Sequence, residues 1–312
     1  MKCLKLISGW SALCLLLGTI TLPVSAQPHV YEQPISSASD LQTEEELIHY
    51  SDYISQYSHG AAAAEIPVDI LNYSTSDQGF ALDKIEGKDA LLMPATGEVH
   101  FKVNVPQQNL YAIKISYYQL DGSGSEAVRT LKINGSTPFY EASVLKFPRV
   151  WNDNSSEQIR DVSGNDVLPT QEEAPRIQTI YLSNSSGLTT ETLYFQFAAG
   201  ESTISLKGVR EPMAILSMSL ETAKEPPSYQ EYLEEKKSQG LKVQNKSYKI
   251  EAEYASAKSD ATMYPLNDRS SPYTSPSSDR YIRYNTIGGS KWQTGGQWIE
   301  WDINVEQDGL YA

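Results

Sequence analysis

Cysteine is almost absent from this sequence. Its 312 residues include only two, Cys3 and Cys14, and both lie among the first 26. The rest of the chain therefore offers no disulfide, no thiolate nucleophile and no cysteine ligand for a metal. A chain of this length can be stabilised by burial of apolar residues alone if it forms one or two domains.

Positive charge is also scarce. The chain has 25 Lys and Arg against 39 Asp and Glu, a formal net charge of −14. Lys2 and Lys5 account for all the charge of the first 26 residues, so the remainder carries about −16. Such a field repels nucleic-acid phosphates and anionic membranes. We therefore exclude nucleic acid as a partner and expect a neutral or cationic one.

The sequence has no apolar run long enough for a typical membrane span. Residues 6–20 are mostly apolar but fall short of the roughly 20 residues that cross a bilayer. Two lysines precede this run, and Pro23 and the small residues Val24, Ser25 and Ala26 follow it, as in a cleaved signal peptide. We predict a signal peptide over 1–26 and a secreted, extracellular protein that could be attached to the cell surface. An uncleaved anchor is the alternative.

Alternation of apolar and polar residues is the main structural signal. It runs from residue 61 to 222, for example at Val99, Phe101, Val103 and Val105, with Asn134-Gly135 as one of several turn signals. This pattern predicts an all-β fold made of antiparallel β-sandwich modules with short connecting helices.

Two shorter regions interrupt the alternation. Residues 27–60 read as a polar leader and a short helix, with a capping box at Thr43 and Glu46 and an end at Gly60. Residues 223–247 read as a partly helical linker, in which Ser228 and Glu231 form a second capping box. Alternation resumes at 248.

An internal repeat relates the two β regions at an offset of 200. Residues 97–112 and 297–312 are identical at six of sixteen positions, and both have apolar residues at every second position of their first half. We interpret 248–312 as a second, incomplete sandwich module, so that the chain is a truncated tandem repeat. On this interpretation residues 298–305 form a strand with Trp301 in the core.

Aromatic residues beside glycines suggest a carbohydrate site. The chain has 20 Tyr but only six Phe, so most of its one-ring aromatic side chains also carry a polar hydroxyl group. Trp298 falls on the outward face of the predicted strand, next to Gly295-Gly296 and close to Trp292, which suits stacking on a sugar ring. The alternative is that these rings cover the end of the sandwich.

A proline-rich loop supplies further candidate ligand residues. Its rings and planar polar groups are suited to a hydroxyl-rich ligand, although ordinary loop polarity explains the same composition. The candidates are Tyr264, Tyr281, Arg283, Tyr284 and Asn285.

Glu251 and Glu253 open the second β region. Their i, i+2 spacing would place both carboxylates on one face of a strand, where they could hold a structural Ca²⁺. Solvated strand acids are the alternative. We expect no other cofactor.

Catalytic motifs are missing. The four histidines, His29, His49, His59 and His100, are scattered, and the sequence has no zinc-protease motif, phosphate loop or nucleophile elbow. We expect a protein that is not an enzyme, although its many acidic residues leave a paired-carboxylate glycosidase site as a rival.

Several short motifs resemble known sugar-handling proteins. Ile250-Glu-Ala-Glu-Tyr254 resembles the opening of galactose-binding-like carbohydrate-binding modules, and Gly200-Glu-Ser-Thr-Ile-Ser-Leu206 resembles their late strand. Phe147-Pro-Arg-Val-Trp151, Tyr264-Pro-Leu-Asn-Asp-Arg269 and Gly296-Gln-Trp-Ile-Glu-Trp301 are similar to the long extracellular solute-binding proteins of Gram-positive sugar ABC transporters, which carry such modules before their solute-binding lobes.

This resemblance implies sandwich modules of the galactose-binding-like or jelly-roll type. It also implies an extracellular, non-catalytic carbohydrate-binding accessory region of a sugar transporter. Its partners would be an oligo- or polysaccharide and the membrane components of an ABC transporter. The solute-binding lobes and the lipobox of that family are missing from the sequence. The alternatives are an accessory region of a secreted glycan-degrading enzyme and a cell-wall adhesion protein.

Overall fold

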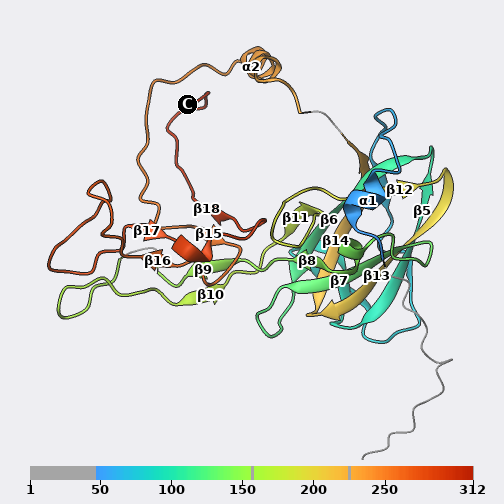
Figure 1. Cartoon of the computed structure of the whole chain (residues 1–312), viewed down its shortest axis with the longest axis horizontal. Coiled ribbons are helices and arrows are strands. Elements are labelled where there is room, and N and C mark those ends of the chain that lie inside the picture. The colour runs from blue at the N-terminus through green and yellow to red at the C-terminus, as the bar shows by residue number, and fades with distance from the viewer. Residues whose placement is uncertain (1–46, 156–157, 224–225, 312) are drawn as a thin grey trace, which may run out of the picture. The chain divides into compact units, whose positions relative to one another are not determined.

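The computed structural model describes residues 47–155, 158–223 and 226–311 (Figure 1). These residues all belong to one compact unit. The predicted signal peptide, and Thr43 and Glu46 of the predicted first capping box, lie outside the described residues. None of the helices in the described part is long and apolar enough to cross a membrane.

Two antiparallel sheets form a β-sandwich over residues 66–222, as the alternation predicts. The seven-stranded sheet has the order β11 (Gln178–Tyr181), β6 (Asn109–Gln119), β14 (Met213–Thr222), β4 (Lys88–Met93) and β3 (Ala81–Ile85), with β1 (Ile66–Val68) on β14 and β12 (Tyr194–Phe197) on β6. The five-stranded sheet has the order β2 (Tyr73–Ser74), β5 (Gly97–Val105), β13 (Gly200–Arg210), β7 (Ala127–Ile133) and β8 (Leu145–Phe147).

Strand β5 shows why this sequence folds as a sandwich. Val99, Phe101, Val103 and Val105 are all buried, and the residues between them are not. They pack in one hydrophobic cluster with residues of the other sheet, such as Ile113 of β6. Each such side chain contributes roughly 1.5–3 kcal/mol by leaving water. Period-2 alternation therefore fixes which face of the strand is buried.

The predicted turn at Asn134-Gly135 is confirmed. Asn134 has φ 50° and Gly135 has φ 88°, so both adopt the left-handed backbone that Asn and Gly tolerate best. Ile133 and Ser136 form a β-bridge around them. This turn ends β7.

The first helix is shorter than the sequence predicts. Helix α1 spans Tyr50–Ile54 and ends with Ser55 as its C-cap, not at Gly60. Its two buried tyrosines face strand β12: the backbone N–H of Tyr194 donates to the Tyr50 hydroxyl (3.0 Å), and that of Gln196 donates to the Tyr53 hydroxyl (2.8 Å). Tertiary contacts with the edge of β12 therefore define this helix, which lies beside that strand in Figure 1. A 3₁₀ turn, η1 (Tyr140–Ser143), precedes β8.

The second helix follows its sequence signals closely. Helix α2 spans Tyr229–Ser238, and Ser228 and Glu231 form the predicted capping box. Gly240, with φ 86°, follows its C-cap. No side chain of this helix is buried.

Residues 248–311, here called the C-terminal segment, contain only short strands. A four-stranded sheet joins the segment to two strands that lie between β8 and β11 in the sequence. Its order is β10 (Gln171–Glu173), β9 (Trp151–Asp153), β15 (Ala257–Lys258) and β18 (Ile299–Glu300). Strands β16 (Pro265–Leu266) and β17 (Thr286–Ile287) pair separately, and the 3₁₀ turn η2 covers Gly289–Lys291. The four-stranded sheet thus contains residues from both sides of the predicted linker. The predicted domain boundaries remain predictions.

The predicted strand over 298–305 is wrong for most of its length. Strand β18 covers only Ile299–Glu300, and Ile303 and Val305 are 54% and 40% exposed, whereas Val103 and Val105 of the repeat are 4% and 1% exposed. Trp301 is only half-buried, and its indole donates to the Ala252 carbonyl (2.9 Å). Alternation buries a face only where partner strands and an opposing sheet exist, and among the described residues none pairs with 301–305.

Candidate functional site

A groove of about 520 Å³ lies where the C-terminal segment meets the sandwich near β8 and β11. We call it the groove. The sandwich contributes Tyr117, Glu126, Lys146, Pro148, Gln178, Ile180, Tyr181, Ser183, Asn184, Ser185, Thr190 and Thr192, and the C-terminal segment contributes Ser259, Asp260, Thr294, Gly295, Gly296, Gln297 and Trp298. Its volume falls in the range of small-molecule sites.

Hydroxyl and amide groups dominate the groove lining. Gln178, Asn184 and Gln297 each bring a planar amide that can both donate and accept hydrogen bonds. Three serines and three threonines add six hydroxyl groups: Ser183, Ser185, Ser259, Thr190, Thr192 and Thr294. The groove therefore offers many uncharged hydrogen-bonding groups over a short distance.

Trp298 is the aromatic residue that the C-terminal segment adds to the groove. Its backbone N–H donates to the Ser259 hydroxyl (2.9 Å), and its carbonyl accepts from the Ser259 N–H (3.1 Å). The guanidinium of Arg176 lies 5.4 Å from the centre of the indole, within the range of a cation–π contact. The backbone of Trp298 is therefore held by Ser259, and its indole is held by Arg176.

Arg176 also pairs with Glu300, the next residue but one after Trp298. Its two terminal nitrogens donate to the two carboxylate oxygens at 2.9 Å and 2.7 Å, a bidentate pair. This pair holds the pKa of Glu300 below its ordinary value and raises that of Arg176. Both side chains are about half exposed.

A second, smaller hollow of about 180 Å³ adjoins the groove at Tyr181. The Tyr181 hydroxyl donates to Glu221 (3.0 Å), and Lys114 forms ion pairs with Glu221 and with Glu65. Burial, and then the hydrogen bond to Glu221, raise the pKa of Tyr181, while Glu221 raises that of Lys114. Glu221, the charged residue of this lining, is therefore paired within the protein.

Of the seven predicted ligand residues, only Trp298 lines the groove. Trp292 is 42% exposed and lies outside the lining, where its indole donates to the Gln297 carbonyl (3.4 Å). Tyr264 is half-buried, and its carbonyl accepts from the Gly288 N–H (3.1 Å). The structure does not bring these two rings into the groove beside Trp298.

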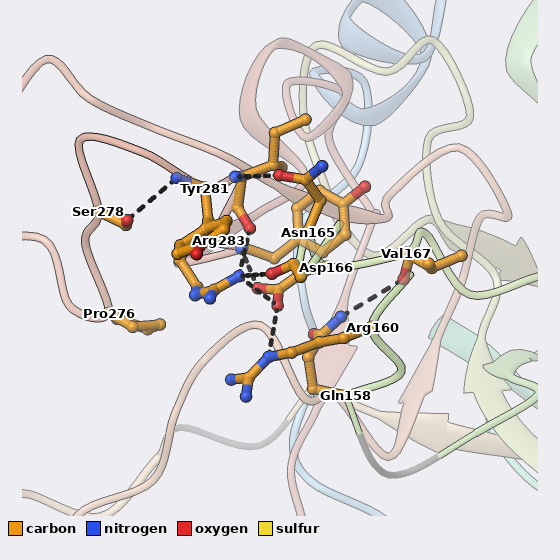
Figure 2. Close-up of polar contacts among 12 residues, drawn as sticks. Gln158, Arg160, Asn165, Asp166, Val167, Pro276, Ser278, Tyr281 and Arg283 are labelled. Carbon is orange, nitrogen blue, oxygen red and sulfur yellow. Dashed lines mark hydrogen bonds and ion pairs between the residues drawn. The ribbon is translucent and has the colours of Figure 1, made fainter. Parts of the chain in front are cut away.

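Two of the predicted residues, Arg283 and Tyr284, bind the buried carboxylate of Asp166, and a third, Tyr281, lies against Arg283. Figure 2 shows Asp166, Arg283 and Tyr281. Arg283 and Arg160 donate to one oxygen (3.1 and 3.2 Å), and the Tyr284 N–H donates to the other (3.0 Å). The ring of Tyr281 lies 5.0 Å from the Arg283 guanidinium. These contacts join the loop that contains 281–284 to the turn around Asp166, which is a structural role. Ligand contact by these residues remains a prediction.

Asn285 also has its polar groups occupied within the protein. Its amide N–H groups donate to the carbonyls of Asp268 (2.9 Å) and Pro276 (2.8 Å), and its amide oxygen accepts from the Asp268 N–H (2.8 Å). The residue is buried. It fixes the shape of its loop.

The predicted calcium ligands lie in a turn and not in a strand. Glu251 pairs with Lys249 (2.6 Å), while Glu253 is buried with one carboxylate oxygen that has no hydrogen-bond partner. Burial raises the pKa of Glu253. Ca²⁺ takes six to eight oxygen ligands, and no group of three or more metal-ligating side chains occurs among the described residues. The residues present therefore do not form a calcium shell, and calcium binding remains a prediction.

One histidine has partners that superficially suggest nucleophilic catalysis. Nδ1 of His100 lies 2.8 Å from the Ser205 hydroxyl and 3.9 Å from a Glu98 carboxylate oxygen. A catalytic triad needs the serine and the acid on opposite ring nitrogens, whereas here both lie at the same nitrogen. This cluster cannot perform triad chemistry.

Sequence reasoning missed most of the groove. Gln178, Asn184 and Gln297 belong to segments that read as ordinary polar strand ends and loops. Of these three residues, only Gln297 had a signal in the local sequence, namely its position beside the predicted ligand residue Trp298. The others come together through tertiary contacts.

Comparison with known proteins gives partial structural similarity to carbohydrate-binding modules. A family 35 module from Clostridium thermocellum matches with a TM-score of 0.27 and 11% identity, covering 52% of this chain and 100% of the module. The C-terminal family 6 module of a laminarinase from Zobellia galactanivorans matches with a TM-score of 0.28 and 12% identity, covering 51% and 100%.

A larger protein, a β-(1,4)-mannanase with a family 35 module from Podospora anserina, matches with a TM-score of 0.27 and 12% identity over 54% of this chain. The chain spans about a quarter (26%) of that enzyme. No protein-family model and no curated protein matches the chain.

Proposed function

We propose that this protein is a secreted, non-catalytic carbohydrate-binding protein and that the groove is its ligand site. The observation that carries the proposal is the lining itself: amides and hydroxyls surround a groove to which Trp298 adds an indole. A sugar ring presents hydroxyl groups at its edge and C–H groups on its face. The polar groups of the groove fit the first, and the indole fits the second.

The charge of the lining favours a neutral ligand. Glu126 and Asp260 are acidic and Lys146 is basic, and Lys146 pairs with Glu126 (3.4 Å). The protein as a whole is strongly acidic, with a net charge of −14. An uncharged oligo- or polysaccharide avoids the repulsion that an anionic ligand would meet.

Two tryptophans of the C-terminal segment provide the test. We expect Trp298→Ala to weaken binding to the best ligand of a broad glycan array by about tenfold or more, because stacking and burial are both lost. Trp292→Ala is the matched control, since Trp292 lies outside the groove, and it should leave affinity within about twofold. Affinities would be measured by isothermal titration calorimetry.

Absence of any bound glycan would refute the proposal. Equal losses for the two tryptophan variants would show that the ligand binds elsewhere.

The wider role that we propose is an accessory one outside the cell. The sequence motifs quoted above support association with a sugar ABC transporter, and the alternative is association with a secreted glycan-degrading enzyme or a role in cell-wall adhesion. Chemical cross-linking in the source cells, followed by mass spectrometry, distinguishes these roles. Transporter membrane subunits among the products would support the first role, a glycosidase the second, and wall polymer alone the third.

A further inference from the structure

The groove is built from two parts of the chain that are far apart in sequence. Its sandwich side comes from residues between 117 and 192, and its other side from residues between 259 and 298. Neither side alone encloses the groove. The site therefore depends on how firmly the C-terminal segment is held against the sandwich.

One joint between the two parts is a backbone contact at two glycines. The Gly295 N–H donates to the Gly187 carbonyl (2.6 Å). A Cβ on Gly187 would lie 2.5 Å from the Thr294 methyl group, and one on Gly295 would lie 3.1 Å from the Gly187 oxygen. A side chain at Gly187 would displace Thr294, and the φ of 80° at Gly187 also favours glycine; a side chain at Gly295 would crowd the Gly187 carbonyl.

A second joint beside the groove is Arg176, which lies shortly before β11 of the sandwich. It contacts two residues of the segment at once, through the bidentate pair with Glu300 and the approach to the Trp298 indole. A planar guanidinium suits both contacts, because it forms two parallel hydrogen bonds and lies against an aromatic face. Arg176 is the residue that fixes the groove's indole relative to the sandwich.

We propose that the groove is a two-part site, completed only when residues 294–300 dock on the sandwich, and that Arg176 is the positioning residue for this docking. This inference rests on the proposed carbohydrate function, because it concerns the same groove. A ligand that contacts both parts binds the docked state alone. By linkage, ligand binding and docking stabilise each other.

Charge reversal at the Arg176–Glu300 pair tests the inference. Arg176→Ala should weaken binding of the best oligosaccharide from the glycan array by about tenfold, since it removes a bidentate pair and a cation–π contact. Arg176→Glu should weaken it further because two carboxylates would then face each other. The double variant Arg176→Glu/Glu300→Arg restores the ion pair but not the contact with the Trp298 indole, so it should bind more tightly than Arg176→Glu and less tightly than wild type.

Hydrogen exchange supplies a readout that is independent of affinity. In the free protein, amides of residues 294–300 should exchange about tenfold faster in Arg176→Ala than in wild type, and saturating oligosaccharide should slow them in wild type. Lys102→Ala is the control, because its exposed pair with Glu201 (2.8 Å) lies on β5 and β13, away from the groove lining. Far-UV circular dichroism confirms that each variant is folded.

The outcomes separate the inference from the function on which it rests. If Arg176→Ala binds like wild type while Trp298→Ala does not, the two-part site is wrong and the carbohydrate function stands. A double variant that binds no more tightly than Arg176→Glu, and whose residues 294–300 are no better protected, would overturn the role of the Arg176–Glu300 pair in docking. If wild type binds no glycan, the function and the two-part site fall together.

Discussion

Arg149 and Glu211 form a buried ion pair just after strand β8. Arg149 is almost fully buried and donates to Glu173 (2.6 Å), to Glu211 (3.0 Å) and to the Ser125 carbonyl (2.6 Å). Glu211 has φ 58° and accepts from both the N–H and the hydroxyl of Ser123. Those hydrogen bonds and Arg149 lower the pKa of Glu211, so the carboxylate is stabilised in its charged form.

Removal of the Arg149 side chain should therefore lower the stability of the fold. We expect Arg149→Ala to lower the free energy of unfolding by about 3–5 kcal/mol, because the Glu211 carboxylate would stay buried without its positively charged partner. Urea denaturation at pH 7, followed by circular dichroism, measures this loss. A loss as small as the one expected for the exposed Lys102→Ala variant, below about 1 kcal/mol, would contradict it.

At the scale of the element, α2 is a helix whose local signals are sufficient to place it. Its capping box satisfies backbone N–H groups at the first turn, and Lys236 and Lys237 lie in the last turn, where positive charge is favourable. None of its residues is buried, so tertiary packing adds little. Helix α1 is the opposite case, because two buried tyrosines that bond to β12 hold only five residues in helical form.

The cap of α2 can be removed without disturbing the sandwich. Ser228→Ala should cost the helix about 1 kcal/mol, which is roughly a fivefold loss of hydrogen-exchange protection over residues 229–238. The melting temperature of the sandwich should not change. Ser238→Ala, at the other end of the same helix, is the control, since its hydroxyl bonds only to the Glu235 carbonyl (2.7 Å). Equal effects of the two substitutions would argue against the cap.

At the scale of the whole molecule, apolar burial is concentrated in the sandwich. The hydrophobic cluster lies entirely between residues 50 and 220. In the C-terminal segment, the buried apolar residues are Ala257, Met263, Pro265 and Ile287. Polar contacts supplement this small core, such as the fully buried Lys258 amine bound to Asp153 (2.5 Å).

This imbalance predicts two unfolding transitions. All four described tryptophans, at positions 151, 292, 298 and 301, lie in the C-terminal segment or in β9, which pairs with it. Tryptophan fluorescence of the Trp10→Phe protein should therefore report loss of the segment at a lower urea concentration than the circular dichroism of the sandwich. Coincident transitions would show instead that both parts unfold as one unit.

Much of the first β region could be predicted from sequence because its signals are local. Val99, Phe101 and the Asn134-Gly135 turn needed only the period of a strand and the backbone preference of two residues. The same pattern at Ile303 and Val305 predicted a buried strand face, and this prediction was wrong because both residues are exposed. Of the candidate site, Trp298 was found, and Gln178, Asn184 and Arg176 were not, because their role depends on which distant residues they meet.

The sequence by itself determined the acidic charge, the absence of disulfides outside the first 26 residues, the antiparallel sandwich and helix α2. Charge and composition are sums over residues, and strand periodicity and capping act over a few positions. It took the tertiary structure to show that Trp298 meets Arg176, and that Arg283, with Tyr281 against it, binds the buried carboxylate of Asp166. Contacts between residues over a hundred positions apart depend on the packing of whole elements, which no local pattern encodes.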